Sequence, residues 1–301
     1  MKLETDLPFA LVDVFAAGPF GGNPLPVVEG AEKLSTARLK SIAREFNQSE
    51  TTFVLQPTRP DAHLRLRSFT AAGIEVFGAG GHNTLGAWWW LAQSGKLSLG
   101  GKQTSFTQEI GDRVLSVAIV AADGMFFDVV MNQECPSWGA MVTAIDGLAS
   151  ALSLPAQAID VALFRVQVVS TGAAHLMVPL RDAATVDSAL PNATALLPIL
   201  QSAGAEGCYI FSLGQRNSLA DVYARFFNPT VGIAEDPATG TAAGPLAAHL
   251  VKHCVVPEGM VTVEQGTLMG RTSLIRVEVE GDVVRVHGRG VLAASGILHS
   301  G

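Results

Sequence analysis

The sequence predicts an α+β protein made of two similar domains, and three observations lead to this expectation. Short runs of alternating apolar and polar residues recur along the chain, whereas few segments have helical spacing. Strands and helices do not alternate strictly, which counts against a doubly wound parallel sheet. The two halves also carry an internal repeat, and 301 residues are enough for two medium-sized domains.

Alternating runs in both halves of the chain predict half-buried strands. They span residues 11–15, 64–68, 115–119, 126–131, 166–170, 222–227, 275–279 and 283–286. The last two flank a compact turn signal at Glu280, Gly281 and Asp282. A shorter apolar run at 53–55 predicts one more strand, directly after the segment that carries Glu50.

Helical spacing occurs at residues 36–46, 83–94 and 242–253. The first of these helices has one apolar face, and either Ser35 or Thr36 can serve as its N-cap. The second and third are apolar nearly all round, so we expect each to be buried at the centre of a domain. Gly95 stands where a C-terminal glycine ends the second helix.

The internal repeat has the order strand, glycine-rich turn and buried helix in both halves. The matched positions are Gly73 and Gly232, Gly81 and Gly240, His82 and Thr241, and Leu91 and Leu250. Duplication explains this shared order better than chance does. Two domains of this kind would face each other across a pseudo-two-fold cleft.

The two glycine-rich turns predict a binding site for an anion. A helix N-terminus leaves backbone N–H groups without intrahelical partners, and the helix dipole makes that end electropositive. Glycines just before the helix let a ligand approach the backbone closely. Two such ends facing one cleft would hold a carboxylate from both sides. The alternative is that both are ordinary strand-to-helix turns with capping residues.

Glu50 is a candidate general base because it lies at the mouth of a predicted strand, among small hydroxyl residues. Partial desolvation raises the pKa of a carboxyl group toward the range in which it can accept and return a proton. The alternative is an exposed loop glutamate. Glu75, Glu235 and Asp236 are further candidates, and the residues alone do not choose among them. Asp236 precedes a proline, so its extended conformation should aim it at a ligand more readily than Glu235.

Composition limits the partners of the protein. The formal net charge of −7, with no basic cluster, argues against nucleic acid or an anionic membrane surface, and no apolar run approaches the roughly 20 residues that span a bilayer. The three cysteines and the histidines lack metal-ligand spacing, so we expect reduced thiols, no metal and a cytoplasmic location. A dinucleotide fingerprint that would start at Gly78 lacks its third glycine, because Asn83 stands there. The expected partners are small molecules or protein subunits.

Five segments, in order and spacing, resemble the phenazine-biosynthesis (PhzF-like) family over about residues 10–295. They are Asp13-Val14-Phe15 followed by Phe20-Gly21-Gly22-Asn23-Pro24-Leu25, Ser49-Glu50-Thr51-Thr52-Phe53, Gly80-Gly81-His82-Asn83-Thr84-Leu85-Gly86, Glu235-Asp236-Pro237-Ala238-Thr239-Gly240-Thr241-Ala242, and Gln265-Gly266 with Met269-Gly270-Arg271.

The resemblance implies the diaminopimelate-epimerase-like fold, in which two β-barrel-like domains each wrap around a central helix and the active site lies in the interdomain cleft. It implies an N-terminal domain at 1–125, a C-terminal domain at 126–285, and a final strand at about 286–301 that returns to the first domain. Members are usually homodimers.

The resemblance also implies a cofactor-independent isomerase of a small carboxylic or amino acid, with Glu50 as the catalytic proton carrier. His82 and Asp236 match residues that bind or orient the substrate, and Thr241 stands where the family commonly has serine. The full set of expected substrate-binding residues is Asn23, Gly81, His82, Asp236, Gly240 and Thr241.

The chain departs from the family pattern in the first turn, where one extra residue between Glu75 and His82 puts the equivalence of Glu75 in doubt. Asn83 replaces a frequent proline. Related racemases carry a thiol on each helix turn; here no cysteine lies at either turn, and a hydroxyl with a pKa far above 7 cannot replace a thiolate base. Two-thiol racemisation is therefore excluded. An epimerase or dehydratase that uses the same carboxylate, and a non-catalytic metabolite-binding protein, stay open as alternatives.

Overall fold

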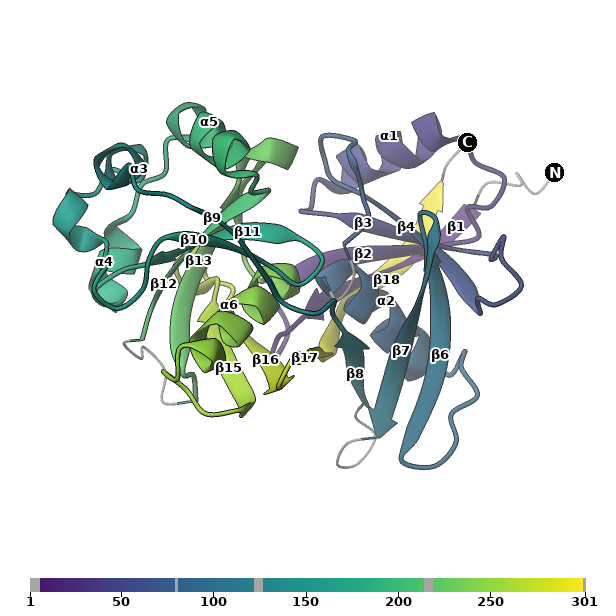
Figure 1. The fold of residues 1–301 in the computed structure, drawn as a ribbon. Coiled ribbons are helices and arrows are strands. Elements are labelled where there is room, and N and C mark those ends of the chain that lie inside the picture. Colours follow the sequence, from purple (N-terminus) through teal and green to yellow (C-terminus); the bar gives the residue numbers. More distant parts are fainter. Residues whose placement is uncertain (1–5, 79–80, 122–126, 214–218, 300–301) are drawn as a thin grey trace. The chain divides into compact units, whose positions relative to one another are not determined.

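The computed structural model describes residues 6–78, 81–121, 127–213 and 219–299, and the chain divides into two compact units (Figure 1). Unit 1 consists of Met1–Asn132 and His287–Gly301, and unit 2 of Gln133–Val286. Many strands and few helices make the protein α+β, as the sequence predicts. Among the described residues, no helix is both long and apolar enough to cross a bilayer.

Unit 1 is a mixed sheet. Its strands are β1 (Asp6–Val14), β2 (Asn23–Glu29), β3 (Thr51–Leu55), β4 (Leu64–Phe69), β5 (Glu75–Val76), β6 (Gln103–Ile110), β7 (Arg113–Ala121), β8 (Phe127–Asn132) and β18 (Gly290–His299). The final strand, β18, pairs antiparallel with β1, which pairs antiparallel with β2. From there the pairing is parallel for β2–β3, antiparallel for β3–β4 and β4–β5, parallel for β4–β6, and antiparallel for β6–β7.

Helix α2 (His82–Gln93) is the central element of unit 1. Ten of its twelve residues are buried, and it contacts β1, β2, β3, β7, β8 and β18. Trp88 is fully buried and donates from Nε1 to Oε1 of Gln108 at 2.7 Å. The helix approaches the sheet closely because Gly86 has no side chain; a Cβ there would lie 2.5 Å from Cγ2 of Val14. The predicted helix that is buried all round is confirmed.

Helix α1 (Thr36–Phe46) covers β3 and β4 of unit 1. Its apolar face turns Leu39 and Ile42 into a small core, as the spacing of apolar residues predicts. The side chain of Ser35 accepts a hydrogen bond from the Arg38 N–H and caps the helix. Asn47 ends it in the left-handed conformation.

Unit 2 repeats the pairing scheme of unit 1. Its strands are β9 (Ser137–Met141), β10 (Gln167–Ser170), β11 (Ala174–Pro179), β12 (Gly207–Ser212), β13 (Val222–Asn228), β14 (Ile233–Asp236), β15 (Gly259–Gln265), β16 (Ser273–Glu280) and β17 (Val283–Gly288), whose last two residues fall in unit 1. The pairing is parallel for β11–β12, antiparallel for β12–β13 and β13–β14, parallel for β13–β15, and antiparallel for β15–β16. This is the sequence of pairings from β2 to β7, so the internal repeat is confirmed.

Helix α6 (Gly240–Lys252) corresponds to α2, with ten of thirteen residues buried and with contacts to β10, β11 and β16. The sequence prediction begins this helix two residues too late. The remaining helical segments of unit 2 are α3 (Ile145–Ala151), α4 (Ala183–Ser188), α5 (Ala193–Ala203), η1 (Ala156–Ala158), η2 (Pro229–Val231) and η3 (Thr267–Met269).

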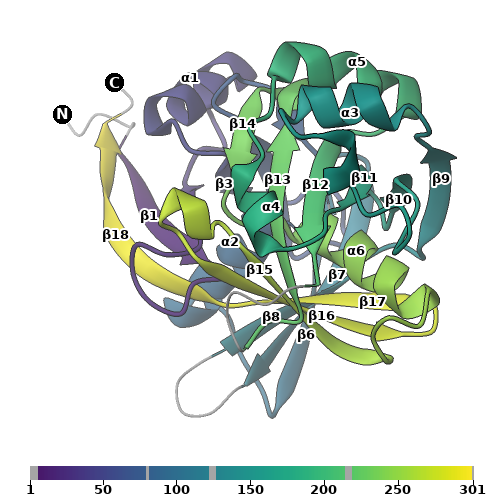
Figure 2. The same cartoon turned by 90° about the vertical axis from the view of Figure 1, so that its left-hand side faces the viewer.

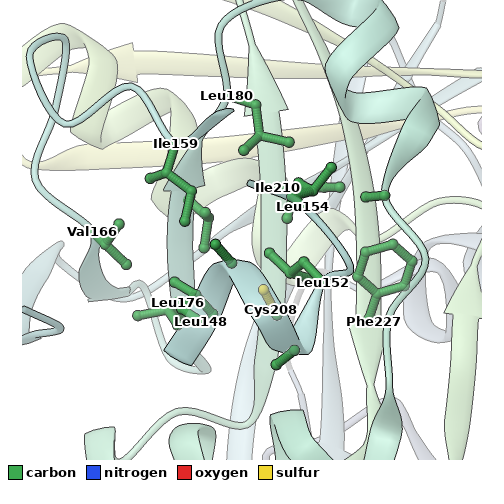
Figure 3. Packing of buried hydrophobic residues seen from close by; sticks show 14 of the residues in the cluster. Leu148, Leu152, Leu154, Ile159, Val166, Leu176, Leu180, Cys208, Ile210 and Phe227 are labelled. Carbon is green, nitrogen blue, oxygen red and sulfur yellow. The ribbon is translucent and has the colours of Figure 1, made fainter. Parts of the chain in front are cut away.

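The main core of unit 2 lies between its strands and the helices α3 and α5, which Figure 2 shows next to each other. Leu148 and Leu152 meet Leu176, Cys208 and Ile210 from the strands β11 and β12 in this cluster (Figure 3). Because side chains alternate along a strand, the neighbours of these strand residues face the side of the sheet that α6 contacts.

Candidate active site

The N-terminus of α2 is a buried turn with an unusual N-cap. Gly81 occupies the N-cap position and provides no side-chain cap, whereas His82 and Asn83 are each only 4% exposed. The Thr84 hydroxyl donates to the Gly81 carbonyl oxygen at 3.1 Å. The anion site that the sequence predicts at this turn stays a prediction.

Glu50 lies at the same end of unit 1 as the tip of α2. It directly precedes β3, and the Thr52 hydroxyl donates to the Asn83 carbonyl oxygen at 3.4 Å. Glu50 is half-buried, and its Oε2 atom is closed off from solvent. The alternative interpretation of Glu50, an exposed loop glutamate, is therefore wrong.

Asn23 joins this group through the sheet. Asn23 is the first residue of β2. Strand β2 runs parallel to β3, with Val27 opposite Thr52, so both strands start at the same end of the sheet. Asn23 is fully buried. Asn23 and Glu50 thus lie near the starts of two adjacent parallel strands, and Thr52 links β3 to the first turn of α2, which carries His82.

The tip of α6 in unit 2 is built around Asp236 and Thr239. Asp236 is 4% exposed, and its Oδ2 accepts a hydrogen bond from the Thr239 hydroxyl at 2.5 Å. Thr239 is the N-cap residue but makes no side-chain cap bond; its hydroxyl donates to Asp236, and its hydroxyl oxygen accepts from Nε2 of Gln265. The Gly240 carbonyl oxygen accepts from Nε2 of Gln133 at 3.0 Å, and Thr241 is half-buried.

Two other candidate carboxylates, Glu75 and Glu235, are held in matching ion pairs. The Arg67 guanidinium donates twice to Glu75, at 2.7 and 2.8 Å, and the Arg225 guanidinium donates twice to Glu235, at 2.8 Å each. Glu75 is therefore the structural counterpart of Glu235, despite the different spacing in the two turns. A carboxylate that is bound bidentately to arginine is a poor general base, so the candidates at the two tips are Glu50 and Asp236.

None of the three cysteines occurs within the two glycine-rich turns themselves. Cys208 is buried in the core of unit 2, and burial raises the pKa of its thiol to about 12. Cys254 follows the opposite end of α6, and Cys135 is exposed. Within the part of the chain that the structure describes, no group of three His, Cys, Asp or Glu side chains is arranged to hold a metal ion.

His175 of β11 is a buried histidine close to Asp236 in unit 2. It is 2% exposed, packs edge-on against Phe226 with ring centroids 5.0 Å apart, and burial lowers its pKa to about 3. Phe226 is itself paired with Asp236 across β13 and β14. The imidazole is therefore neutral at pH 7 and lies one aromatic ring away from Asp236.

This burial predicts that acid destabilises unit 2. An unfolded histidine binds its proton near pH 6.5, whereas folded His175 binds it only near pH 3, so stability falls as pH drops from 6.5 toward 3. At pH 5 we expect His175 to account for about 2 kcal/mol of this loss. Urea titrations at pH 7 and pH 5 measure the effect.

His175→Leu should flatten the pH dependence of the unfolding free energy by that amount, because the leucine binds no proton in either state. Leu176→Ala is the matched control, because it removes packing from the same strand, β11, but no titratable group, so it should lower stability and leave the slope unchanged. An equal slope in wild type and His175→Leu would contradict a buried neutral imidazole.

The sequence did not predict the buried polar side chains that hydrogen-bond the N-terminal turn of α6. Gln133 and Tyr209 were not singled out, and Gln265 was noted only within a family motif. The signal that could have found Tyr209 is a polar hydroxyl within the apolar strand β12, because a buried polar group must find a hydrogen-bond partner.

A family model described as phenazine biosynthesis-like protein matches residues 12–296 of this chain. The trans-2,3-dihydro-3-hydroxyanthranilate isomerase of Pseudomonas aeruginosa is 32% identical over 296 residues, which cover 96% of this chain and 98% of that protein.

Solved structures share the fold. A phenazine biosynthesis protein of the PhzF family from Bacillus anthracis matches with a TM-score of 0.86 at 24% identity, covering 97% of this chain and 99% of that one. A hydroxyproline epimerase from Agrobacterium vitis matches with a TM-score of 0.69 at 11% identity, covering 99% of this chain and 94% of that one. These likenesses confirm the predicted fold class.

Proposed function

This chain belongs to the family of phenazine biosynthesis-like proteins and is an isomerase, and from that premise we propose that Glu50 moves a proton between two carbons of a small carboxylic acid. The observation that carries the proposal is the position of Glu50: half-buried, at the start of β3, and tied through Thr52 to the first turn of α2. No cofactor takes part in the proposed reaction.

The reaction needs one group that is base and acid in turn. The Glu50 carboxylate takes a proton from a carbon next to a double bond, and the electron pair of that C–H bond shifts the double bond by one position. The glutamic acid so formed returns the proton to the carbon at the far end of the original double bond. Atoms and charge balance without an oxidant or reductant, and the half-buried position of Glu50 suits a group that must serve in both protonation states.

Two sets of residues are proposed to bind the substrate. In unit 1 these are Asn23, Gly81 and His82, at the end of the sheet where Glu50 lies. In unit 2 they are Asp236, Gly240 and Thr241 at the tip of α6. Backbone N–H groups of the two helix starts suit a carboxylate, and the Asp236 carboxylate suits an ammonium or hydroxyl group.

The relative from Pseudomonas aeruginosa is named for trans-2,3-dihydro-3-hydroxyanthranilate, a compound that offers a carboxylate, an amino group and a hydroxyl. We propose this compound, or a small cyclic amino acid like it, as the substrate class. We also propose that the protein is a homodimer, because the family it resembles usually forms one. We propose a cytoplasmic location because its three cysteines are free thiols.

The proposal is tested by incubating the protein with trans-2,3-dihydro-3-hydroxyanthranilate in deuterated water and following the ring protons by NMR. We expect an isomerised product. Exchange without isomerisation would favour an epimerase, loss of water would favour a dehydratase, and binding without any exchange would favour a metabolite-binding protein.

Asp236→Asn should weaken binding of the same compound about tenfold or more, because a charge-assisted hydrogen bond is lost. KM for the isomerisation measures this. Asp221→Asn is the control, since Asp221 is exposed and lies on a loop that carries no proposed site residue. An unchanged KM in Asp236→Asn would remove Asp236 from the substrate-binding set.

A further inference from the structure

The side-chain amide of Gln265, at the end of β15, is fully buried and is saturated with hydrogen bonds. Its Nε2 donates to the Asp236 carbonyl oxygen at 2.7 Å and to the Thr239 hydroxyl oxygen at 3.0 Å. Its Oε1 accepts from the Tyr209 hydroxyl at 2.8 Å and from the Thr239 backbone N–H at 3.2 Å. Two donors and two acceptor positions are all that a glutamine amide has, and three of these four bonds go to the turn from Asp236 to Thr239.

The backbone of the turn fixes which way round this amide lies. The Thr239 N–H, which can only donate, faces Oε1 of Gln265, and the Asp236 carbonyl oxygen, which can only accept, faces Nε2, so a flipped amide would lose both bonds. The Tyr209 hydroxyl therefore acts as the donor toward Oε1. Tyr209 is fully buried, and burial together with the Asp236 charge raises the pKa of its hydroxyl well above 10. The hydroxyl therefore keeps its proton at neutral pH and can donate to Gln265.

The backbone beside Gln265 presses against the same turn. Gly266 has a φ of +78°, and a Cβ there would lie 2.4 Å from the Pro237 carbonyl oxygen. That oxygen also accepts a hydrogen bond from the Ser273 hydroxyl at 2.9 Å. The turn is thus held at Asp236, Pro237 and Thr239 by buried hydrogen bonds.

We propose that Gln265 and Tyr209 are positioning residues that hold the Asp236 carboxylate in its binding orientation. The proposal rests on the proposed substrate-binding role of Asp236. The Thr239 hydroxyl accepts a hydrogen bond from Nε2 of Gln265, which can only donate, and uses its single proton to donate to Oδ2 of Asp236. The order of donors from Tyr209 through Gln265 and Thr239 to Asp236 is therefore fixed, and each bond polarises the next.

The test measures KM and kcat for trans-2,3-dihydro-3-hydroxyanthranilate in Gln265→Leu, Tyr209→Phe and the double variant. Gln265→Leu should raise KM about 10- to 100-fold, since it leaves the turn that carries Asp236 without its donors, and should change kcat much less. Tyr209→Phe should raise KM by a smaller factor, and it should add nothing in the Gln265→Leu background, because Tyr209 acts only through the amide.

Two further measurements separate positioning from general stability. Leu196→Ala, in the core of unit 2, should lower the melting temperature as Gln265→Leu does but keep the wild-type KM. Hydrogen exchange at the Thr239 N–H should become at least tenfold faster in Gln265→Leu, because this N–H loses its acceptor.

A wild-type KM in Gln265→Leu, an additive effect of Tyr209→Phe, or an equal rise of KM in Leu196→Ala would each overturn the proposal. So would unchanged exchange at Thr239. If wild type does not act on the compound at all, the proposed function fails, and the exchange rate at Thr239 then decides alone whether Gln265 holds this turn.

Discussion

Glu50→Gln is expected to lower the rate of isomerisation about 1,000-fold, the size typical for loss of a positioned general acid–base group. Glutamine keeps the shape and the hydrogen-bonding oxygen of glutamate but cannot take up a proton at neutral pH. Because Glu50 is half-buried at the start of a well-packed strand, the variant should fold and bind the substrate with little change in affinity. Rates of product formation and of proton exchange with deuterated water measure the effect.

The matched control is Glu45→Gln. Glu45 is exposed on α1 of the same unit, so removing its charge should leave both rates unchanged. If Glu50→Gln retained more than about a tenth of the wild-type rate, another group would have to carry the proton, since loss of a general base costs at least about 100-fold.

Arg225→Met should have the largest effect on stability, a loss of about 3–4 kcal/mol in the free energy of unfolding. The Arg225 side chain is 7% exposed and donates to Glu235 and to the carbonyl oxygens of Val186, Asp187 and Ala189. Methionine matches its apolar stem but leaves a carboxylate and three carbonyl groups without this donor. A urea titration measures the loss.

Arg67→Met supplies the comparison within the same chain. Arg67 makes the equivalent pair with Glu75 in unit 1, but its side chain is 17% exposed and it also donates to an exposed hydroxyl, that of Thr36. Water can replace its bonds, so we expect a loss of only about 1–2 kcal/mol. Equal losses in the two variants would show that burial does not govern the strength of these pairs.

Much of the fold was predictable because local signals agreed with it. The helix Thr36–Phe46 was predicted to its ends, since an amphipathic pattern and a serine cap coincide there. The two central helices were predicted from their all-round apolar surface, although α6 begins at Gly240, two residues before the predicted start. Gly81 and Gly240 at both helix starts indicated the repeat, which the matching strand pairings confirm.

Other elements were missed for physical reasons. Strand β12 (Gly207–Ser212) is buried on both faces and lacks the alternation that marks a half-buried strand. The helices α3 and α4 are seven and six residues long, too short for a periodic pattern to stand out. Helix α5 carries Pro198 within it, a residue that argues against helix when only the sequence is considered.

The candidate site was predictable in part. Carboxylates and glycines were located from motifs, but Glu50, Glu75, Glu235 and Asp236 could not be ranked, because the arginine partners that occupy Glu75 and Glu235 lie eight and ten residues away in sequence. The hydrogen bonds of Tyr209 and Gln265 could not be predicted from the sequence, because they join the strands β12, β14 and β15, which are far apart along the chain.

The claim that everything else depends on is that Glu50 reaches the carbon that loses its proton. A crystal structure of the Glu50→Gln variant with the bound substrate tests this directly, because that variant binds the compound without converting it. We predict that the side-chain amide of residue 50 lies roughly 3–3.5 Å from the reacting carbon. A substrate bound with residue 50 outside contact distance of every ring carbon would contradict the mechanism.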